Sequence, residues 1–302
     1  MTTASTARRA GSAATTRRRP RRRGGPLGYL RTNGLTMLGV VLIAVYCLFP
    51  FYWMVVSSLQ VEPWIFGNNF IPQHPTLENY RAVFGTRNHF GKALLNSVIV
   101  AGVSTVVALV VGTFAAYAIA RLRFRFKALV LGAILSIVMF PGIALLIPMF
   151  EWVTTLGWID TYQAMIIPDI SFALPLTVWI LTSFFAEMPW ELEQAAKIDG
   201  ATPGQAFRKV IVPLAAPGVF TTAILVFIFV WNEFLIAYTM TQTNAAQPVT
   251  VAITKFTGSS QFQQPFGTIM AAGVIVTIPL IIIVLIFQRR IVAGLTAGGV
   301  KG

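Results

Sequence analysis

The chain has 302 residues, of which 56% are hydrophobic and only 11% charged, and its mean hydropathy is +0.72. This composition excludes a soluble globular protein and indicates an integral membrane protein. One cysteine excludes an internal disulfide, and two histidines leave little for a metal site. The net charge of +13 does not indicate a folded nucleic-acid-binding domain, because nine arginines and no acid fall within the first 31 residues.

The first segment, residues 1–31, consists largely of Ala, Ser, Thr, Gly and Arg. It is too polar and too charged to bury a core, so we predict a disordered basic arm on the cytosolic side of the membrane. A targeting signal is the alternative. It is less favoured because the apolar stretch that follows is longer than that of a signal peptide and no small-residue cleavage site closes it.

Residues 32–302 predict one all-α integral membrane domain. Six stretches are apolar enough to cross a bilayer, for which about 20 residues suffice. They lie near 36–58, 93–119, 128–150, 163–185, 218–240 and 268–287. Several prolines fall within them, which a bundle of neighbouring helices tolerates.

The orientation follows from the cations in the connecting segments. With the amino terminus inside, 19 of the 23 Lys and Arg fall on the cytosolic side and four on the outer side. Short cytosolic segments carry an excess of Lys and Arg. Both termini are therefore predicted to be cytosolic, which places the connection 186–217 inside and the connection 241–267 outside.

The cytosolic connection 186–217 is longer than a simple turn. Its sequence predicts a helix over Trp190–Ile198, a break at Asp199–Gly200 and a second helix that starts at Thr202–Pro203 and ends at Pro213 and Pro217. Two interpretations stay open from the pattern alone. The segment is either a solvated amphipathic loop or a compact knob that contacts a partner beneath the membrane.

The spacing within this connection carries a resemblance. Gln194-Ala195-Ala196, then Gly200, Val210 and Val212-Pro213, resembles the EAA loop, E-A-A-x3-G-x9-I-x-L-P, of permease subunits from binding-protein-dependent ABC importers. The departures are Gln194 in place of the motif's Glu, with Glu193 directly before it, and Val in place of Ile and Leu. The likeness extends over nearly all of 35–302, including residues 231–235 and 288–302. It is similar to the sugar-importing, MalG-like class, and most similar there to trehalose-importer permeases of actinobacteria.

The resemblance implies the fold of a type I ABC importer permease in the plasma membrane of a bacterium. It implies a heterodimer with a second permease subunit, two copies of an ATPase subunit, an extracytoplasmic sugar-binding protein and a di- or oligosaccharide as substrate. ATP and Mg would bind the ATPase subunits, and this chain would hold no catalytic residue, cofactor or metal. The residues implied to couple to the ATPase are Glu193, Gln194, Ala195, Ala196, Asp199, Gly200, Ala201 and Pro213.

Two carboxylates, Asp169 and Glu233, fall within predicted spans that offer no Lys or Arg. A charge there costs about 2.5–3.5 kcal/mol at mid-helix, so each needs a reason. They either line a water-filled substrate path, together with Trp231 and Asn232, or are buried between helices as polar glue. A secondary transporter without ATPase subunits is the rival function, although no inverted repeat is apparent.

The outer connection 241–267 is also long for a turn between antiparallel neighbours. The resemblance implies that it reaches into the sugar-binding protein through Ser259, Ser260 and Gln261. The alternative is a solvated connection that only caps the bundle.

Overall fold

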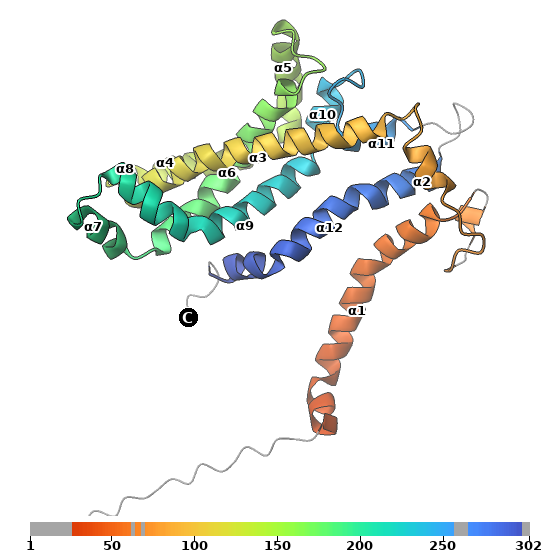
Figure 1. The fold of residues 1–302 in the computed structure, drawn as a ribbon, viewed down its shortest axis with the longest axis horizontal. Coiled ribbons are helices and arrows are strands. Elements are labelled where there is room, and N and C mark those ends of the chain that lie inside the picture. The colour runs from red at the N-terminus through yellow and green to blue at the C-terminus, as the bar shows by residue number, and fades with distance from the viewer. Residues whose placement is uncertain (1–25, 62–63, 68–69, 257–264, 298–302) are drawn as a thin grey trace, which may run out of the picture. The chain divides into compact units, whose positions relative to one another are not determined.

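The computed structural model describes residues 26–61, 64–67, 70–256 and 265–297. Within these ranges all regular secondary structure is helical, as predicted (Figure 1). The elements are α1 (Pro26–Ser58), η1 (Trp64–Phe66), α2 (Glu78–Val83), α3 (Phe90–Arg121), α4 (Lys127–Val138), α5 (Gly142–Thr155), α6 (Gln163–Glu187), α7 (Trp190–Ile198), α8 (Pro203–Ala206), η2 (Phe207–Ile211), α9 (Val212–Trp231), α10 (Leu235–Met240), α11 (Val249–Thr254) and α12 (Phe266–Ala297).

The chain divides into two compact units, Met1–Pro50 and Phe51–Gly302. The described part of the first unit is the beginning of α1, which starts at Pro26, inside the segment predicted as a basic arm. Residues 1–25 of that predicted arm lie outside the described residues. The second unit holds all the other helices and both candidate sites.

In the part of the chain that the structure describes, five helical stretches are long and apolar enough to cross a membrane: 36–58, 90–121, 163–187, 203–231 and 266–288. The predicted span 128–150 is not one straight helix. It is the pair α4 and α5, which are bent by 85° at residues 139–141. Pro141 is extended, with φ −65° and ψ 110°, and proline disfavours helix in the residue before it. The described residues hold up to six candidate spans if this bent pair counts as one.

The predicted fifth span, 218–240, is wrong at both ends. The helix is continuous from Pro203 to Trp231 and breaks at residues 232–234, so α10 is a separate helix of six residues. The predicted sixth span, 268–287, is confirmed by the apolar stretch 266–288, and the helix that contains this stretch, α12, continues to Ala297.

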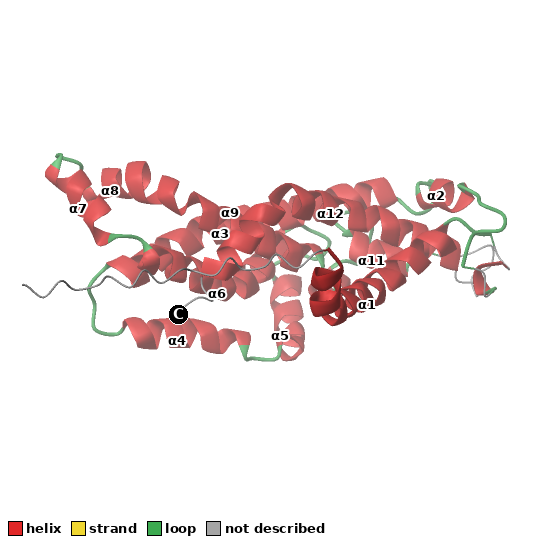
Figure 2. Cartoon of the chain, turned by 90° about the horizontal axis from the view of Figure 1, so that it is seen from below, coloured by secondary structure: helices red, strands yellow, loops and turns green. Residues whose placement is uncertain are grey.

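The core of the second unit is the packing of α3 against α6 and α9, which run side by side (Figures 1 and 2). Small residues allow the close approach. A side chain at Gly112 would lie 2.5 Å from the methyl of Thr177, and one at Gly218 would lie 2.5 Å from the ring of Phe184. Helices in membranes associate through such small-residue contacts. These three helices carry the two candidate sites, one near each end.

Candidate functional site

The first site is a bend between two helices, the elbow, residues 190–206. Helix α7 ends at Asp199, and Gly200 adopts the left-handed conformation with φ +88°. Its N–H donates to the carbonyl of Lys197, while that of Ala201 donates to the carbonyl of Ala196 at 2.9 Å. This is the turn that glycine favours after a helix.

The second helix of the elbow begins with a capping box. Thr202 Oγ1 accepts the N–H of Gln205 at 3.3 Å, and Gln205 Oε1 accepts the N–H of Thr202 at 2.9 Å. The predicted break and the predicted start at Thr202–Pro203 are therefore both confirmed. Local hydrogen bonds fix the shape of the elbow on both sides of Gly200.

The predicted end of this helix at Pro213 and Pro217 is wrong. The π-helical turn η2, in which the N–H of Val212 donates to the carbonyl of Phe207, leads directly into α9. Pro213 lies directly after this turn, within a helical stretch that is continuous from Pro203 to Trp231, so it does not end the helix. The elbow is thus continuous with a membrane-spanning helix, so a movement of the elbow carries that helix with it.

The coupling residues named from the resemblance divide by exposure. Gln194, Ala195, Asp199, Gly200 and Pro213 are exposed, and Ala196 and Ala201 are half-buried. Glu193 differs from all of them, since it is only 5% exposed.

Glu193 faces the end of α3. Its Oε1 accepts hydrogen bonds from the hydroxyl of Tyr117 at 3.0 Å and from Lys197 Nζ at 2.7 Å. Next to it, the buried Arg121 donates to the carbonyl of Met188 at 2.9 Å and lies 4.9 Å above the ring centroid of Trp190. Residues 188–193 are therefore attached to the last turn of α3.

The electrostatics of Glu193 favour its ionised form. Burial by itself raises the pKa of this carboxyl, but the hydrogen bonds from Lys197 and Tyr117 and the positive charges of Lys197 and Arg121 outweigh burial and lower the pKa below its ordinary value. The ionised carboxylate is thus part of the folded elbow at neutral pH.

The second site is the break that follows α9. Both carboxylate oxygens of Glu233 accept backbone N–H groups of α10, from Ile236 at 2.7 Å and from Ala237 at 2.9 Å. The hydroxyl of Thr250 donates to the carbonyl of Glu233 at 2.9 Å. Glu233 therefore caps α10, which explains why the span ends here rather than at residue 240.

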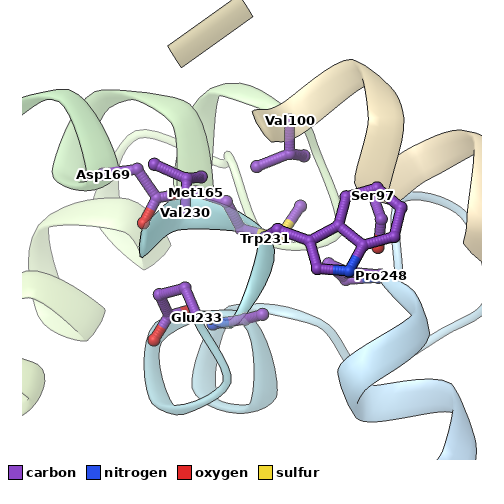
Figure 3. A pocket seen from close by; sticks show the side chains of 9 residues that line it. Ser97, Val100, Met165, Asp169, Val230, Trp231, Glu233 and Pro248 are labelled. Carbon is purple, nitrogen blue, oxygen red and sulfur yellow. Dashed lines mark hydrogen bonds between the residues drawn. The ribbon is translucent and has the colours of Figure 1, made fainter. Parts of the chain in front are cut away.

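Asp169 and Trp231 lie behind this cap. The side chains of Asp169, from α6, and Trp231, from the end of α9, line a cavity of about 10 Å³ together with Glu233 and Ser97 (Figure 3). Asp169 is 1% exposed and Trp231 is 3% exposed, and Asp169 Oδ1 and Trp231 Nε1 have no hydrogen-bond partner among the described residues. A space of this size holds about one water molecule.

Glu233 also borders a much larger hollow of about 600 Å³ on the other side of the break. Asn232 lines the same hollow, and its Nδ2 donates to the carbonyl of Ile228 at 2.7 Å. Apolar side chains of α5, α6 and α9 complete the walls. Of the four residues predicted for a substrate path, the structure thus places Asn232 and Glu233 on a ligand-sized space and Asp169 and Trp231 in the small cavity.

The described part of the outer connection is held against α3. Asn96 donates to the carbonyl of Gln247 at 2.9 Å and accepts from the hydroxyl of Tyr162 at 2.7 Å, and Ser97 Oγ accepts the N–H of Val249 at 2.9 Å. The apolar stretch 93–119 predicted a span but no role for Asn96 and Ser97, although an adjacent Asn and Ser at the start of such a stretch is a signal of polar contacts. Ser259, Ser260 and Gln261 lie outside the described residues.

The chain matches the family described as "binding-protein-dependent transport system inner membrane component" over residues 108–296. It is 53% identical to the trehalose transport system permease protein SugB of Mycobacterium tuberculosis, over 91% of this chain and 100% of that protein. It is 42% identical to the trehalose/maltose transport system permease protein MalG of Thermococcus litoralis, over 89% of this chain and 96% of that protein. A crystal structure of a bacterial ABC transporter involved in the import of the acidic polysaccharide alginate has the same fold, with a TM-score of 0.73 at 23% identity over 86% of this chain and 97% of the other.

The contacts of Glu193 generate a prediction about pH. Glu193→Gln removes the charge that Tyr117 and Lys197 stabilise, so we expect a loss of about 1–3 kcal/mol in the free energy of unfolding at neutral pH. Since the folded-state pKa is lowered, this stabilisation is present above the ordinary value of 4.5 and is lost as the pH falls below it. Thermal unfolding of the purified protein from neutral to acid pH measures the difference, which should shrink toward acid. Glu191→Gln, on the exposed side of α7, is the control and should behave as the parent; a Glu193→Gln protein of parental stability at neutral pH would contradict the assignment.

Proposed function

We propose that this chain, which belongs to the family of inner membrane components of binding-protein-dependent transport systems, imports a disaccharide of the trehalose or maltose type as a permease subunit. The proposed substrate rests on one observation, the 53% sequence identity to a trehalose permease over the full length of that permease. The MalG relative, whose name includes both trehalose and maltose, supports the same substrate class. The chain is a multi-pass protein of the plasma membrane, and its role is transport rather than catalysis.

The partners follow from the same proposal. A second permease subunit completes the translocation path, two copies of an ATPase subunit bind ATP and Mg and hydrolyse ATP, and an extracytoplasmic binding protein delivers the sugar. This assignment leaves ATP hydrolysis to the partners, because the chain matches a family of inner membrane transport components. Both termini of this chain and the elbow are then on the cytosolic side.

The elbow is the proposed contact with the ATPase. Its exposed tip, Asp199–Gly200, has no atom within 4 Å of the position that a side chain on Gly200 would occupy, so a partner can approach the backbone there. Gln194, Ala195, Ala196, Ala201 and Pro213 extend this surface. The hydrogen bond from Tyr117 to the buried Glu193 supports a coupling role in which Glu193 positions the elbow on α3.

Asn232 and Glu233 are the proposed substrate contacts. They border the larger hollow, whose volume suits a disaccharide and whose apolar walls suit the apolar face of a sugar ring. Asp169 and Trp231 support this wall from behind. At the outer end, we propose that the connection 241–267 contacts the binding protein through Ser259, Ser260 and Gln261. Asn96 and Ser97 bind the backbone of Gln247 and Val249 in the described part of this connection.

Transport itself tests the proposed function. Proteoliposomes that contain this chain, its partner permease and the ATPase should accumulate labelled trehalose only with ATP inside and the binding protein outside, and unlabelled maltose should compete. Uptake driven by an ion gradient without the ATPase would instead support a secondary transporter. ATP-dependent transport of an unrelated solute, with none of trehalose or maltose, would exclude the proposed substrate.

Paired glycine substitutions test the elbow. Gly200 and Gly157 both have positive φ, +88° and +68°, and both face open space, so tryptophan at either position costs similar backbone strain, about 1 kcal/mol. Gly200→Trp should insert in the membrane but lose the ATPase subunit during co-purification, together with uptake, because the bulk sits at the proposed contact. Gly157→Trp should retain the ATPase subunit. Equal retention of the subunit by both variants would argue against the elbow as the docking point.

The variant Glu233→Gln tests whether the Glu233 carboxylate contacts the substrate or only caps α10. Glutamine keeps one oxygen for the N–H groups of α10, so the free energy of unfolding should fall by only about 1 kcal/mol. Loss of a charged hydrogen bond to sugar should lower the uptake rate about tenfold. Asp169→Asn, behind the wall, should transport at close to the parental rate. If uptake by Glu233→Gln is unchanged, or falls only in proportion to the amount of folded complex, the carboxylate is a cap alone.

A further inference from the structure

The connection between α3 and α4, residues 122–127, alternates apolar and cationic side chains. Its sequence is Leu122-Arg123-Phe124-Arg125-Phe126-Lys127. Leu122 is 53% exposed, Phe124 40% and Phe126 60%, and both arginines are exposed. The connection begins with extended backbone, φ −77° and ψ 145° at Leu122, and neighbouring side chains of an extended chain point to opposite sides. The segment therefore presents exposed apolar and cationic side chains in close succession.

Both ends of this segment are fixed to the rest of the protein. Arg121, before it, is buried and donates to the carbonyl of Met188. Lys127, at its end, donates to the carbonyl of Ala120 at 3.2 Å and lies 5.9 Å from the ring centroid of Phe124. These two cations are thus occupied by contacts within the chain, and they hold the connection in one shape.

Arg123 and Arg125 are different, because neither has a hydrogen bond or an ion pair with any described residue. The one ion pair among the described residues joins Lys197 and Glu193. Two exposed guanidinium groups two residues apart, neither of them paired with a carboxylate of the described residues, are available to bind an anion. The exposed phenylalanines restrict what that anion can be, since a soluble anion offers nothing to cover them.

The position of the connection identifies the ligand. It directly follows the span 90–121 and precedes α4, at the same end of the unit as α7 and α8 (Figure 2). Aromatic side chains at the end of a span lie at the level of the lipid headgroups, and cations there attract anionic lipids. We propose that Arg123 and Arg125 bind the phosphate of an anionic phospholipid, while Leu122, Phe124 and Phe126 insert into the acyl-chain boundary beside it.

The test compares the assembled transporter in nanodiscs of phosphatidylcholine with and without phosphatidylglycerol. Native mass spectrometry counts the phosphatidylglycerol molecules that the protein retains. Each cation near an anionic surface contributes about 1 kcal/mol, so the double variant Arg123→Gln/Arg125→Gln should bind phosphatidylglycerol about tenfold or more weakly than the parent. Arg123→Lys/Arg125→Lys, which keeps the charges, should recover most of the retention.

The matched control is Arg208→Gln/Lys209→Gln, which removes two exposed cations from η2, where the neighbouring Phe207 is half-buried. This control should lower the retention of phosphatidylglycerol less than Arg123→Gln/Arg125→Gln does. Equal retention by the parent and the Arg123→Gln/Arg125→Gln protein would overturn the proposal. A second outcome would also overturn the proposal: the variant loses the ATPase subunit in nanodiscs of phosphatidylcholine alone, yet retains phosphatidylglycerol in the mixed nanodiscs. That outcome would assign the connection to a protein contact.

Discussion

Inside a bilayer, a helix can break only where other groups accept its backbone N–H donors, and this constraint decides the shape of the chain between α9 and α10. The carboxylate of Glu233 accepts two N–H groups at the start of α10, one on each oxygen. The span can therefore stop at Trp231 without leaving orphaned donors. The break turns Asn232 and Glu233 toward the larger hollow and leaves Trp231 and Asp169 behind them.

The same constraint governs the elbow, where the chain reverses outside the span. Gly200 closes the end of α7, and Thr202 and Gln205 satisfy the first donors of the next helix. The π-helical turn then passes Pro213 into α9 without a stop. A rigid elbow that is continuous with a long helix can transmit a displacement at its tip to residues near the break, because the two sites are opposite ends of one helix.

Glu193 and Gln194 share the place at which the motif has a single carboxylate, and they lie in different surroundings. The motif places a carboxylate at position 194, whereas this chain has glutamine there and a carboxylate one residue earlier. A shift of one residue rotates a side chain by about 100° around a helix. Glu193 consequently reaches Tyr117 and the end of α3, while Gln194 remains exposed. The charge therefore contributes to the attachment of the elbow, and any contact at position 194 is made by an amide.

The sequence by itself determined the features that depend on local composition. Apolar runs predicted the all-α membrane fold and the approximate place of each span, and Asp199-Gly200 with Thr202-Pro203 predicted the elbow break, because capping and proline effects act within a few residues. The tertiary structure decided the rest. The pairing of Asn96 with Gln247 joins residues 151 apart in sequence, and the inward side of Glu193 depends on where α3 ends beside it. The apolar sequence continues to residue 240 and by itself favours one unbroken span, whereas the cap at Glu233 favours a break. The break prevails in the folded arrangement of α6, α9 and residues 248–250, which the sequence alone does not reveal.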